Sequence, residues 1–222
     1  MAGKQSIVYW DSSAFLALLK SENHGPGVLD ALVSQAGAFD RAEITLVTST
    51  IGIMEVLSAE ISDAVRDRFE SMIKRSNFQL VTANEGVARS AAILRKHCYT
   101  NGKSRGLEKY IISPADAIHV TSAMVVKSDI LITLDSRNKA RKQELAMTAV
   151  SDFYPIAGLH SVRIERPSTG LQGFQCFDLA SHLRGFTSPS PLTDALRRPG
   201  KTAVRHRPRL DSRAAFSHQP RI

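Results

Sequence analysis

Four acidic residues of this sequence stand where they could share one site: Asp11, Glu55, Asp116 and Asp135. Asp11 follows a short β-branched and aromatic run, and Asp135 ends an apolar run of the same strand type. Asp116 falls in the first turn of a predicted helix with a Ser-Pro start, where the helix dipole favours a negative charge. Carboxylates that crowd together repel each other unless a cation neutralises them. The set therefore predicts a divalent metal site, and oxygen ligands favour Mg²⁺ or Mn²⁺ over Zn²⁺.

Glu55 is the acid whose place in the site depends on a helix interior. It lies in a predicted helix that runs from Ser49 or Thr50 to about Ile61. The apolar residues expected to form the buried stripe of this helix are Ile51, Met54, Leu57 and Ile61. Glu55 sits beside that stripe, whereas Glu60 is expected to face water. An acidic site of this kind, open to solvent, binds phosphate oxygens and activates water for in-line attack on phosphorus.

Short predicted strands alternate with predicted helices along the first 150 residues. The strands are expected at 7–10, 44–48, 78–81, 129–135 and 147–150. The helices are expected at 14–20, 28–36, 50–61, 64–74, 87–97, 114–126 and 138–146, with a loop at 101–110. This alternation predicts a parallel α/β sheet, in which ligands bind at the carboxyl ends of the strands. Asp11 and Asp135 both fall at such ends.

The composition predicts one domain with a basic extension. The 222 residues are 43% hydrophobic, enough for a buried core, and the formal charge is +8 with a pI near 9.8. From residue 167 onwards nine Lys and Arg face three Asp and Glu, and six of the nine prolines lie there. We therefore expect a folded domain over residues 1–155 and a largely disordered Pro/Arg-rich extension over 156–222.

The cysteines and the hydropathy bear on the compartment. Cys98 and Cys176 are too few and too far apart for a disulfide framework. The sequence contains no apolar run that approaches the roughly 20 residues of a membrane span, and no secretory leader is recognisable. We expect a cytoplasmic protein with no membrane association.

The order of the acidic motifs resembles that of PIN-domain nucleases, and within them the VapC-type toxins of bacterial toxin–antitoxin pairs. The resemblance covers about residues 6–150 and is carried by the segments 8–13 (VYWDSS), 53–56 (IMEV), 114–119 (PADAIH) and 132–135 (ITLD). It implies a three-layer α/β/α sandwich with a central parallel sheet. It also implies a metal-dependent endoribonuclease acting on structured RNA such as tRNA or rRNA, a homodimer, and a small antitoxin partner.

The resemblance also assigns roles to residues. It implies that Asp11, Glu55, Asp116 and Asp135 are the catalytic and metal-binding acids, with Mg²⁺ or Mn²⁺ as the cofactor. Ser13 and Thr133 match polar positions that support the site in many members. The polar loop carries three cations that could contact RNA: Lys103, Arg105 and Lys109.

Each acid also has a structural interpretation. Asp11 could cap the first helix, Asp116 could serve only the helix dipole, and Asp135 could cap the basic helix expected after it. We expect His119, one turn after Asp116, to be a packed or hydrogen-bonded histidine rather than a metal ligand.

Two other functions remain open at this point. A PIN-like protein could hold RNA as a scaffold without cutting it. A phosphoacceptor or phosphatase domain also uses an Asp after the first strand, but a haloacid-dehalogenase-type enzyme needs a second Asp at position 13, where Ser13 stands.

Overall fold

The computed structural model describes residues 5–169, which form a five-stranded parallel sheet with the strand order β3-β2-β1-β4-β5. The strands are β1 (Ser6–Trp10), β2 (Ile44–Ser49), β3 (Phe78–Val81), β4 (Ile130–Ile132) and β5 (Arg163–Glu165). The helices are α1 (Ser12–Leu19), α2 (Val28–Asp40), α3 (Thr50–Ser58), α4 (Asp63–Ile73), α5 (Glu85–Gly102) and α6 (Pro114–Val125), with short 3₁₀ segments η1 (Lys103–Arg105) and η2 (Met147–Phe153). The predicted parallel α/β architecture is confirmed.

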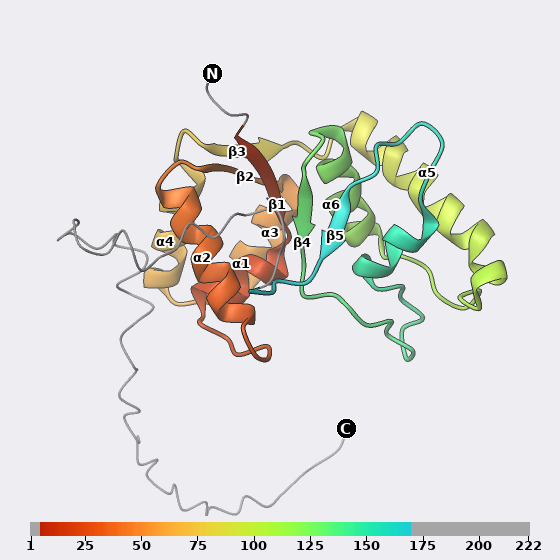
Figure 1. Ribbon diagram of the computed structural model, residues 1–222, viewed down its shortest axis with the longest axis horizontal. Helices are drawn as coiled ribbons and strands as arrows, with labels where there is room; N and C mark the ends of the chain where they lie inside the picture. Colours follow the sequence, from red (N-terminus) through yellow and green to blue (C-terminus); the bar gives the residue numbers. More distant parts are fainter. Residues whose placement is uncertain (1–4, 170–222) are drawn as a thin grey trace, which may run out of the picture.

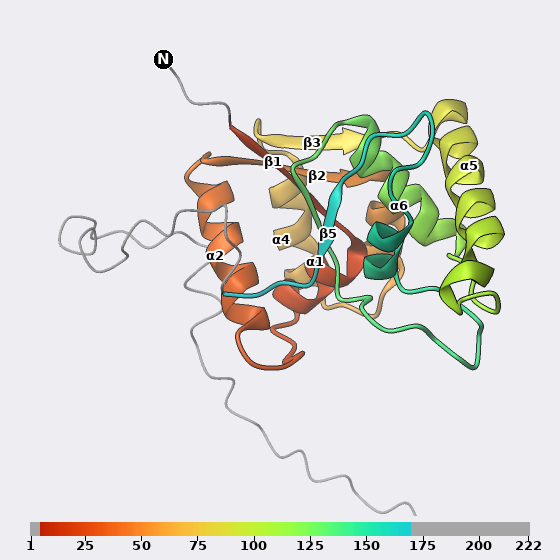
Figure 2. The ribbon, with the colours of Figure 1, turned by 45° about the vertical axis from the view of Figure 1, so that its right-hand side comes forward.

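The sheet separates two hydrophobic cores because successive side chains of a strand point to opposite faces. In β1, Val8 and Trp10 pack into the core formed with α1, α2 and α4, while Tyr9 packs into the core formed with α5 and α6. These helices lie on the two sides of the sheet (Figure 1; Figure 2). The result is the three-layer α/β/α sandwich that the resemblance to PIN-domain nucleases implied.

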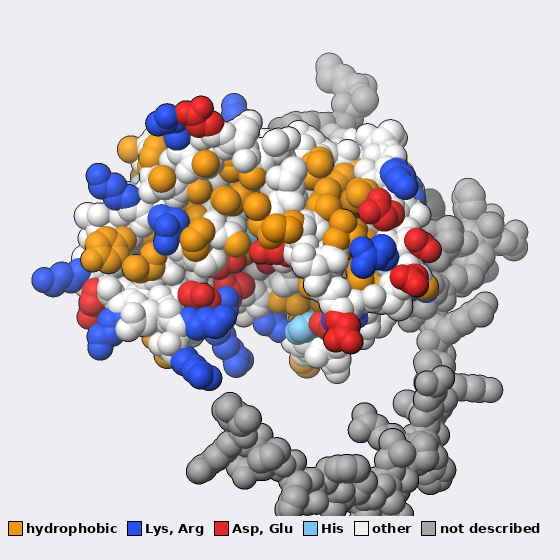
Figure 3. All heavy atoms as spheres, turned by 180° about the vertical axis from the view of Figure 1, so that it is seen from behind, with side chains coloured by type: hydrophobic (Ala, Val, Ile, Leu, Met, Phe, Trp, Pro, Cys, Tyr) orange, Lys and Arg blue, Asp and Glu red, His pale blue; other side chains and the backbone are white. Residues whose placement is uncertain are grey.

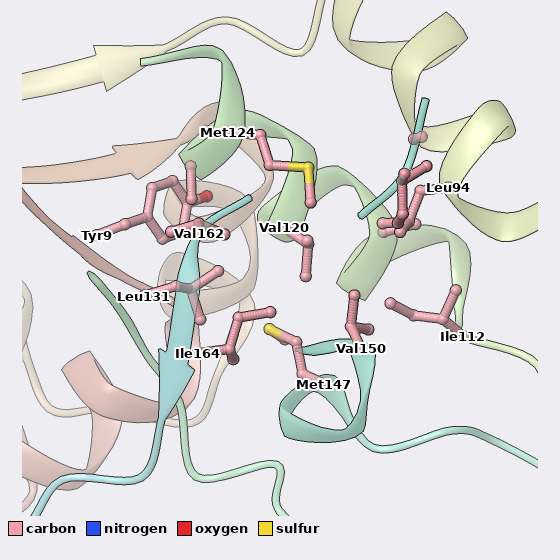
Figure 4. Packing of buried hydrophobic residues seen from close by; sticks show 14 of the residues in the cluster. Tyr9, Leu94, Ile112, Val120, Met124, Leu131, Met147, Val150, Val162 and Ile164 are labelled. Carbon is pink, nitrogen blue, oxygen red and sulfur yellow. The ribbon is translucent and has the colours of Figure 1, made fainter. Parts of the chain in front are cut away.

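The core on the α5 and α6 side is closed by η2. Met147, Val150 and Phe153 are buried at a spacing of three residues, the period at which side chains of a 3₁₀ helix line up on one face. Figure 4 shows Met147 and Val150 pointing toward Ile112 and Ile164. The strand expected at 147–150 is therefore wrong, because the apolar period in this segment is three rather than two.

The basic helix expected at 138–146 is also wrong. The backbone of Lys139 pairs with Glu144 in an antiparallel bridge, and Ile111 pairs with Glu144 from the other side. The Asn138 side chain accepts a hydrogen bond from the amide of Ala146 at 2.8 Å and closes the turn. The amide and carbonyl groups that a helix would use internally are bonded across this turn instead.

The last strand lies further along the chain than the sequence indicated. β5 pairs with β4 through the register Leu131↔Ile164, and Ile164 is buried. The sheet thus includes residues beyond position 155. The remainder of the expected extension, from residue 170, lies outside the described residues. Among residues 5–169 no helix is long and apolar enough to span a membrane.

Candidate active site

Asp11 is held where β1 passes into α1. It is the N-cap of α1, and its Oδ1 accepts hydrogen bonds from the backbone amide of Ala14 at 3.0 Å and the hydroxyl of Ser13 at 2.7 Å. Its Oδ2 accepts a hydrogen bond from the hydroxyl of Thr133 at 2.6 Å. Asp11 is thus both a helix cap and a buried carboxylate, so the structural and functional interpretations do not exclude each other.

The same two hydroxyl groups tie Asp11 to the end of β4. The Ser13 Oγ accepts a hydrogen bond from the amide of Leu134 at 2.9 Å, and the Thr133 Oγ1 accepts one from the amide of Asp135 at 3.0 Å. The strand register places Trp10 opposite Ile132, which brings the two strand ends side by side. Ser13 and Thr133 therefore fix Asp11 relative to the segment that carries Asp135.

Asp116 begins its helix in the geometry predicted for it. The Ser113 hydroxyl accepts a hydrogen bond from the Asp116 amide at 3.1 Å and donates one to the Asp116 Oδ2 at 2.6 Å. Within residues 5–169 the Asp116 Oδ1 accepts no hydrogen bond, so one oxygen is available to a ligand.

The carboxyl groups of Asp11 and Asp116 share an electrostatic property. Burial raises the pKa of Asp11, against the opposing effects of the His119 charge and the hydroxyl hydrogen bonds. Burial also raises the pKa of Asp116, and the negative charge of Asp135 adds to this increase. Both carboxylates therefore lack a full compensating charge, which a divalent cation would supply.

Glu55 is oriented by a buried histidine. Its Oε2 accepts a hydrogen bond from the Ser12 hydroxyl at 2.6 Å and lies 2.9 Å from the Nε2 of His119. The Nδ1 of His119 lies 2.9 Å from the Tyr9 hydroxyl. Because the carboxylate only accepts, Nε2 carries the proton, and in the neutral ring Nδ1 accepts from Tyr9. His119 is therefore the hydrogen-bonded histidine expected from the sequence.

The hydrogen bonds to Glu55 decide its ionisation. Burial alone would raise the pKa of Glu55, but the hydrogen bonds from His119 and Ser12 outweigh burial and lower it. Glu55 is thus an ionised carboxylate with one oxygen fixed. Its second oxygen accepts no hydrogen bond from the described part of the chain.

The buried stripe of the Glu55 helix differs from the expected one. Gly52 and Val56 are its buried residues, whereas Met54 is exposed. The helix needs little apolar surface because Gly52 lets its backbone approach β2 closely, where a Cβ would lie only 2.4 Å from the Thr48 Oγ1. Glu55 then faces α1 and α6, which both contact α3.

Asp135 forms an ion pair with Lys139, a residue that no sequence motif placed in the site. The Lys139 Nζ lies 3.4 Å from the Asp135 Oδ1 and 3.4 Å from the Glu144 Oε2. Burial would lower the pKa of Lys139, but the charges of Asp135, Asp116 and Glu144 outweigh burial and raise it. The Asp135 Oδ2 accepts a hydrogen bond from the amide of Met147 at 3.2 Å. No sequence signal marked Lys139, because its position depends on the turn at 138–146.

The arrangement of these acids determines which kind of metal site they can form. Within residues 5–169, no group of three or more His, Cys, Asp or Glu side chains is arranged to hold a metal by itself. Mg²⁺ does not need such a cage, since one or two carboxylates with waters and substrate phosphates suffice. Asp11 and Asp116 supply carboxylate oxygens of the kind that this requires.

The three expected RNA contacts lie on the segment between α5 and α6. Lys103 and Arg105 are exposed in η1, and Lys109 is exposed in the following turn. The Arg105 guanidinium lies 5.2 Å from the centre of the Phe153 ring, which holds it against the domain. One face of the molecule carries acidic side chains next to Lys and Arg side chains, below a belt of hydrophobic ones (Figure 3).

Comparison with known proteins gives two findings and one negative result. The crystal structure of VapBC2 from Rickettsia felis bound to a DNA fragment from their promoter is similar with a TM-score of 0.43 and 13% sequence identity, over 72% of this chain and 98% of that chain. No curated protein matches this chain in sequence. The model of the PIN domain family matches residues 8–143, which include all four acids. The chain belongs to the PIN-domain family.

Proposed function

We propose that this protein is a metal-dependent endoribonuclease and the toxin component of a VapC-type toxin–antitoxin pair. PIN domains are in general metal-dependent nucleases. The observation that carries the proposal is the pair Asp11, which is buried, and Asp116, which is half-buried, two carboxylates on separate elements whose pKa values desolvation raises. The VapC-type assignment, a cytoplasmic location, tRNA or rRNA as substrate, a homodimer and a small antitoxin partner rest on the sequence resemblance.

The residues divide the work of hydrolysis. Asp11 and Asp116 would hold Mg²⁺ or Mn²⁺, which polarises the scissile phosphate and lowers the pKa of a bound water. The Glu55 carboxylate, fixed through one oxygen by Ser12 and His119, orients the attacking water through the other. Asp135 completes the acidic set directly or through water. Attack of water on phosphorus breaks the bond to the 3′ oxygen and leaves a 5′-phosphate and a 3′-hydroxyl.

Cleavage of tRNA and rRNA by the purified full chain tests the proposal. We expect cuts with Mg²⁺ or Mn²⁺ that EDTA abolishes and that Asp116→Asn abolishes as well. Asp67→Asn, a change of the same kind at an exposed position of α4, should cleave like the wild type. If the wild type, freed of any co-purifying small protein, binds RNA but cuts none with either metal, a non-cleaving RNA-binding function replaces this proposal.

A further inference from the structure

A hollow of about 230 Å³, open to solvent, lies at the start of α6. Arg95 of α5, the residues Ile111, Ser113 and Pro114, and Lys142 of the following turn contribute to its lining. Ser113 belongs at the same time to the candidate active site, because its hydroxyl donates to the Asp116 carboxylate. Ser113 thus links the lining of the hollow to the Asp116 carboxylate.

The charges along the hollow favour an anion. Among residues 5–169, Arg95 and Lys142 have no acidic partner within ion-pair distance. Arg95 Nε donates to the carbonyl of Ile112 at 3.0 Å, which fixes the side chain and leaves its two terminal amino groups free for a ligand. Glu144 also lines the hollow and shares the Lys139 ammonium, at 3.4 Å, with Asp135.

Ile111 and Pro114 give the hollow an apolar wall beside the polar side chains of Ser113 and Gln143. Ile111 is 37% exposed, and Pro114 presents its ring at the first position of α6. Unpaired guanidinium and ammonium groups bind phosphate, and apolar surface beside them suits a ribose or a base. A single nucleotide combines these features, whereas a metal ion or an acidic side chain alone would leave the apolar wall unused.

We propose that this hollow binds one nucleotide of the RNA substrate, with Arg95 and Lys142 contacting a phosphate next to the scissile one. This inference rests on the proposed nuclease function and assigns its substrate contacts to the turn at 142–144 and the face of α5 that carries Arg95. The RNA strand then runs from the acids across Ser113 into the hollow.

Binding of a labelled single-stranded RNA oligonucleotide, followed by fluorescence anisotropy over a series of salt concentrations, tests this inference. The full-length Asp116→Asn variant serves as the parent, so that binding is measured without cleavage. Adding Arg95→Met and Lys142→Met should weaken binding about tenfold at low salt. It should also make the slope of log K against log salt shallower by about 0.7 to 1.4, because each phosphate contact to single-stranded RNA contributes about 0.7.

A matched control removes the same charge elsewhere. Lys96 is an exposed neighbour of Arg95 on α5, and Lys127 is exposed beyond the far end of α6. Lys96→Met with Lys127→Met in the same parent should keep the affinity and the slope. Equal effects of the two double variants, or no effect of the first, would overturn the inference while wild-type cleavage still supported the nuclease function. A parent that binds no RNA, with a wild type that cuts none, would overturn both.

Discussion

The carboxylates of the candidate site are of two kinds, which differ in the hydrogen-bond donors and charges around them. Asp11 and Asp116 receive hydrogen bonds from hydroxyl and amide groups but no full counter-charge, and burial raises their pKa values. Glu55 receives a histidine as well as a hydroxyl, and its pKa is lowered. The first kind is suited to holding a cation, and the second to staying ionised next to water.

The raised pKa of Asp116 predicts how stability depends on pH. A carboxyl group whose pKa is higher in the folded than in the unfolded chain contributes stability at low pH and loses it as pH rises through the interval between the two values. The Asp116→Asn variant has no carboxyl group to ionise at this position, so it does not lose this stability as the pH rises. In metal-free protein we expect the variant to melt at a higher temperature than the wild type at neutral pH, with the difference disappearing in acid. Melting curves over a pH series measure this, and a lower melting temperature at neutral pH would contradict it.

His119 is predicted to position Glu55. Because His119 donates to the Glu55 Oε2, His119→Ala should raise the pKa of Glu55 and move the acidic limb of the cleavage profile to higher pH. We expect kcat to fall about tenfold or more with little change in KM. The variant should also lose about 1–3 kcal/mol of stability, since the Tyr9 hydroxyl loses its hydrogen bond to His119.

The rescue variant separates positioning from folding. His119→Gln keeps an amide donor and should restore part of kcat and the original acidic limb. An unchanged acidic limb in His119→Ala, combined with a loss of stability, would show that the histidine only supports the core.

Lys139 is predicted to compete with the metal. Its ammonium group lies 3.4 Å from the Asp135 Oδ1 and raises the cost of adding a cation there. Lys139→Met should bind Mn²⁺ about three- to tenfold more tightly in calorimetry, as expected for loss of a partly exposed ion pair. Lys142→Met removes the same charge from the same turn without touching Asp135. A similar gain in both variants would mean that only net charge matters.

At the scale of elements, the close approach of α3 to β2 fixes the distance between Glu55 and the other acids. Gly52 makes this approach possible, and its position next to His119 links the helix packing to the hydrogen bonds of Glu55. The Thr48 hydroxyl below it donates to the carbonyl of Trp10 at 2.9 Å, so the same contact reaches the end of β1. The element that carries Glu55 is thus placed by a residue without a side chain.

Gly52→Ala tests this placement. A Cβ would lie 2.4 Å from the Thr48 Oγ1 and 3.2 Å from the His119 Cε1, so the helix or its neighbours must shift. We expect a loss of roughly 1–3 kcal/mol in denaturant unfolding, with a loss of cleavage larger than the stability change explains. Ser58→Ala, at the exposed end of the same helix, should affect neither. Wild-type cleavage by Gly52→Ala would show that the acids tolerate a displaced α3.

At the scale of the whole molecule, β5 is the last strand in the described part of the chain. Val162 and Ile164 are buried against the α5 and α6 core, and Arg166 donates hydrogen bonds to the Ser136 hydroxyl at 3.2 Å and to the carbonyl of His24. Segments from both halves of the chain therefore meet at Arg166.

Truncation locates the end of the domain. A chain ending after residue 169 keeps β5 and should unfold at the wild-type denaturant midpoint. A chain ending after residue 160 loses two buried aliphatic side chains and should be less stable by roughly 3 to 6 kcal/mol. The chain that ends after residue 169 should also bind RNA less tightly and with a shallower salt dependence than the full chain, because it lacks nine of the basic residues. Equal stability of the two truncated chains would place the end of the domain before β5.

The sequence by itself determined the alternation of strands and helices, the parallel sheet and the elements that carry the four acids. These features follow from local period and from chain order: Asp11 must follow β1, and Asp116 must begin α6, whatever the rest of the chain does. The same reasoning failed at 138–146 and 147–150, where backbone pairing with Ile111 and burial of Met147 outweighed local propensity.

Only the tertiary structure decided which groups surround each carboxylate. The contacts of Glu55 with His119 and of Asp11 with Thr133 join residues 64 and 122 positions apart, and the hollow at Arg95 and Lys142 joins α5 to a turn that no period in the sequence revealed. Ionisation depends on burial and on neighbouring charges and dipoles, which are properties of the packed molecule. The chain order therefore identifies the four acids, and the packing of the folded molecule sets their ionisation and their contacts.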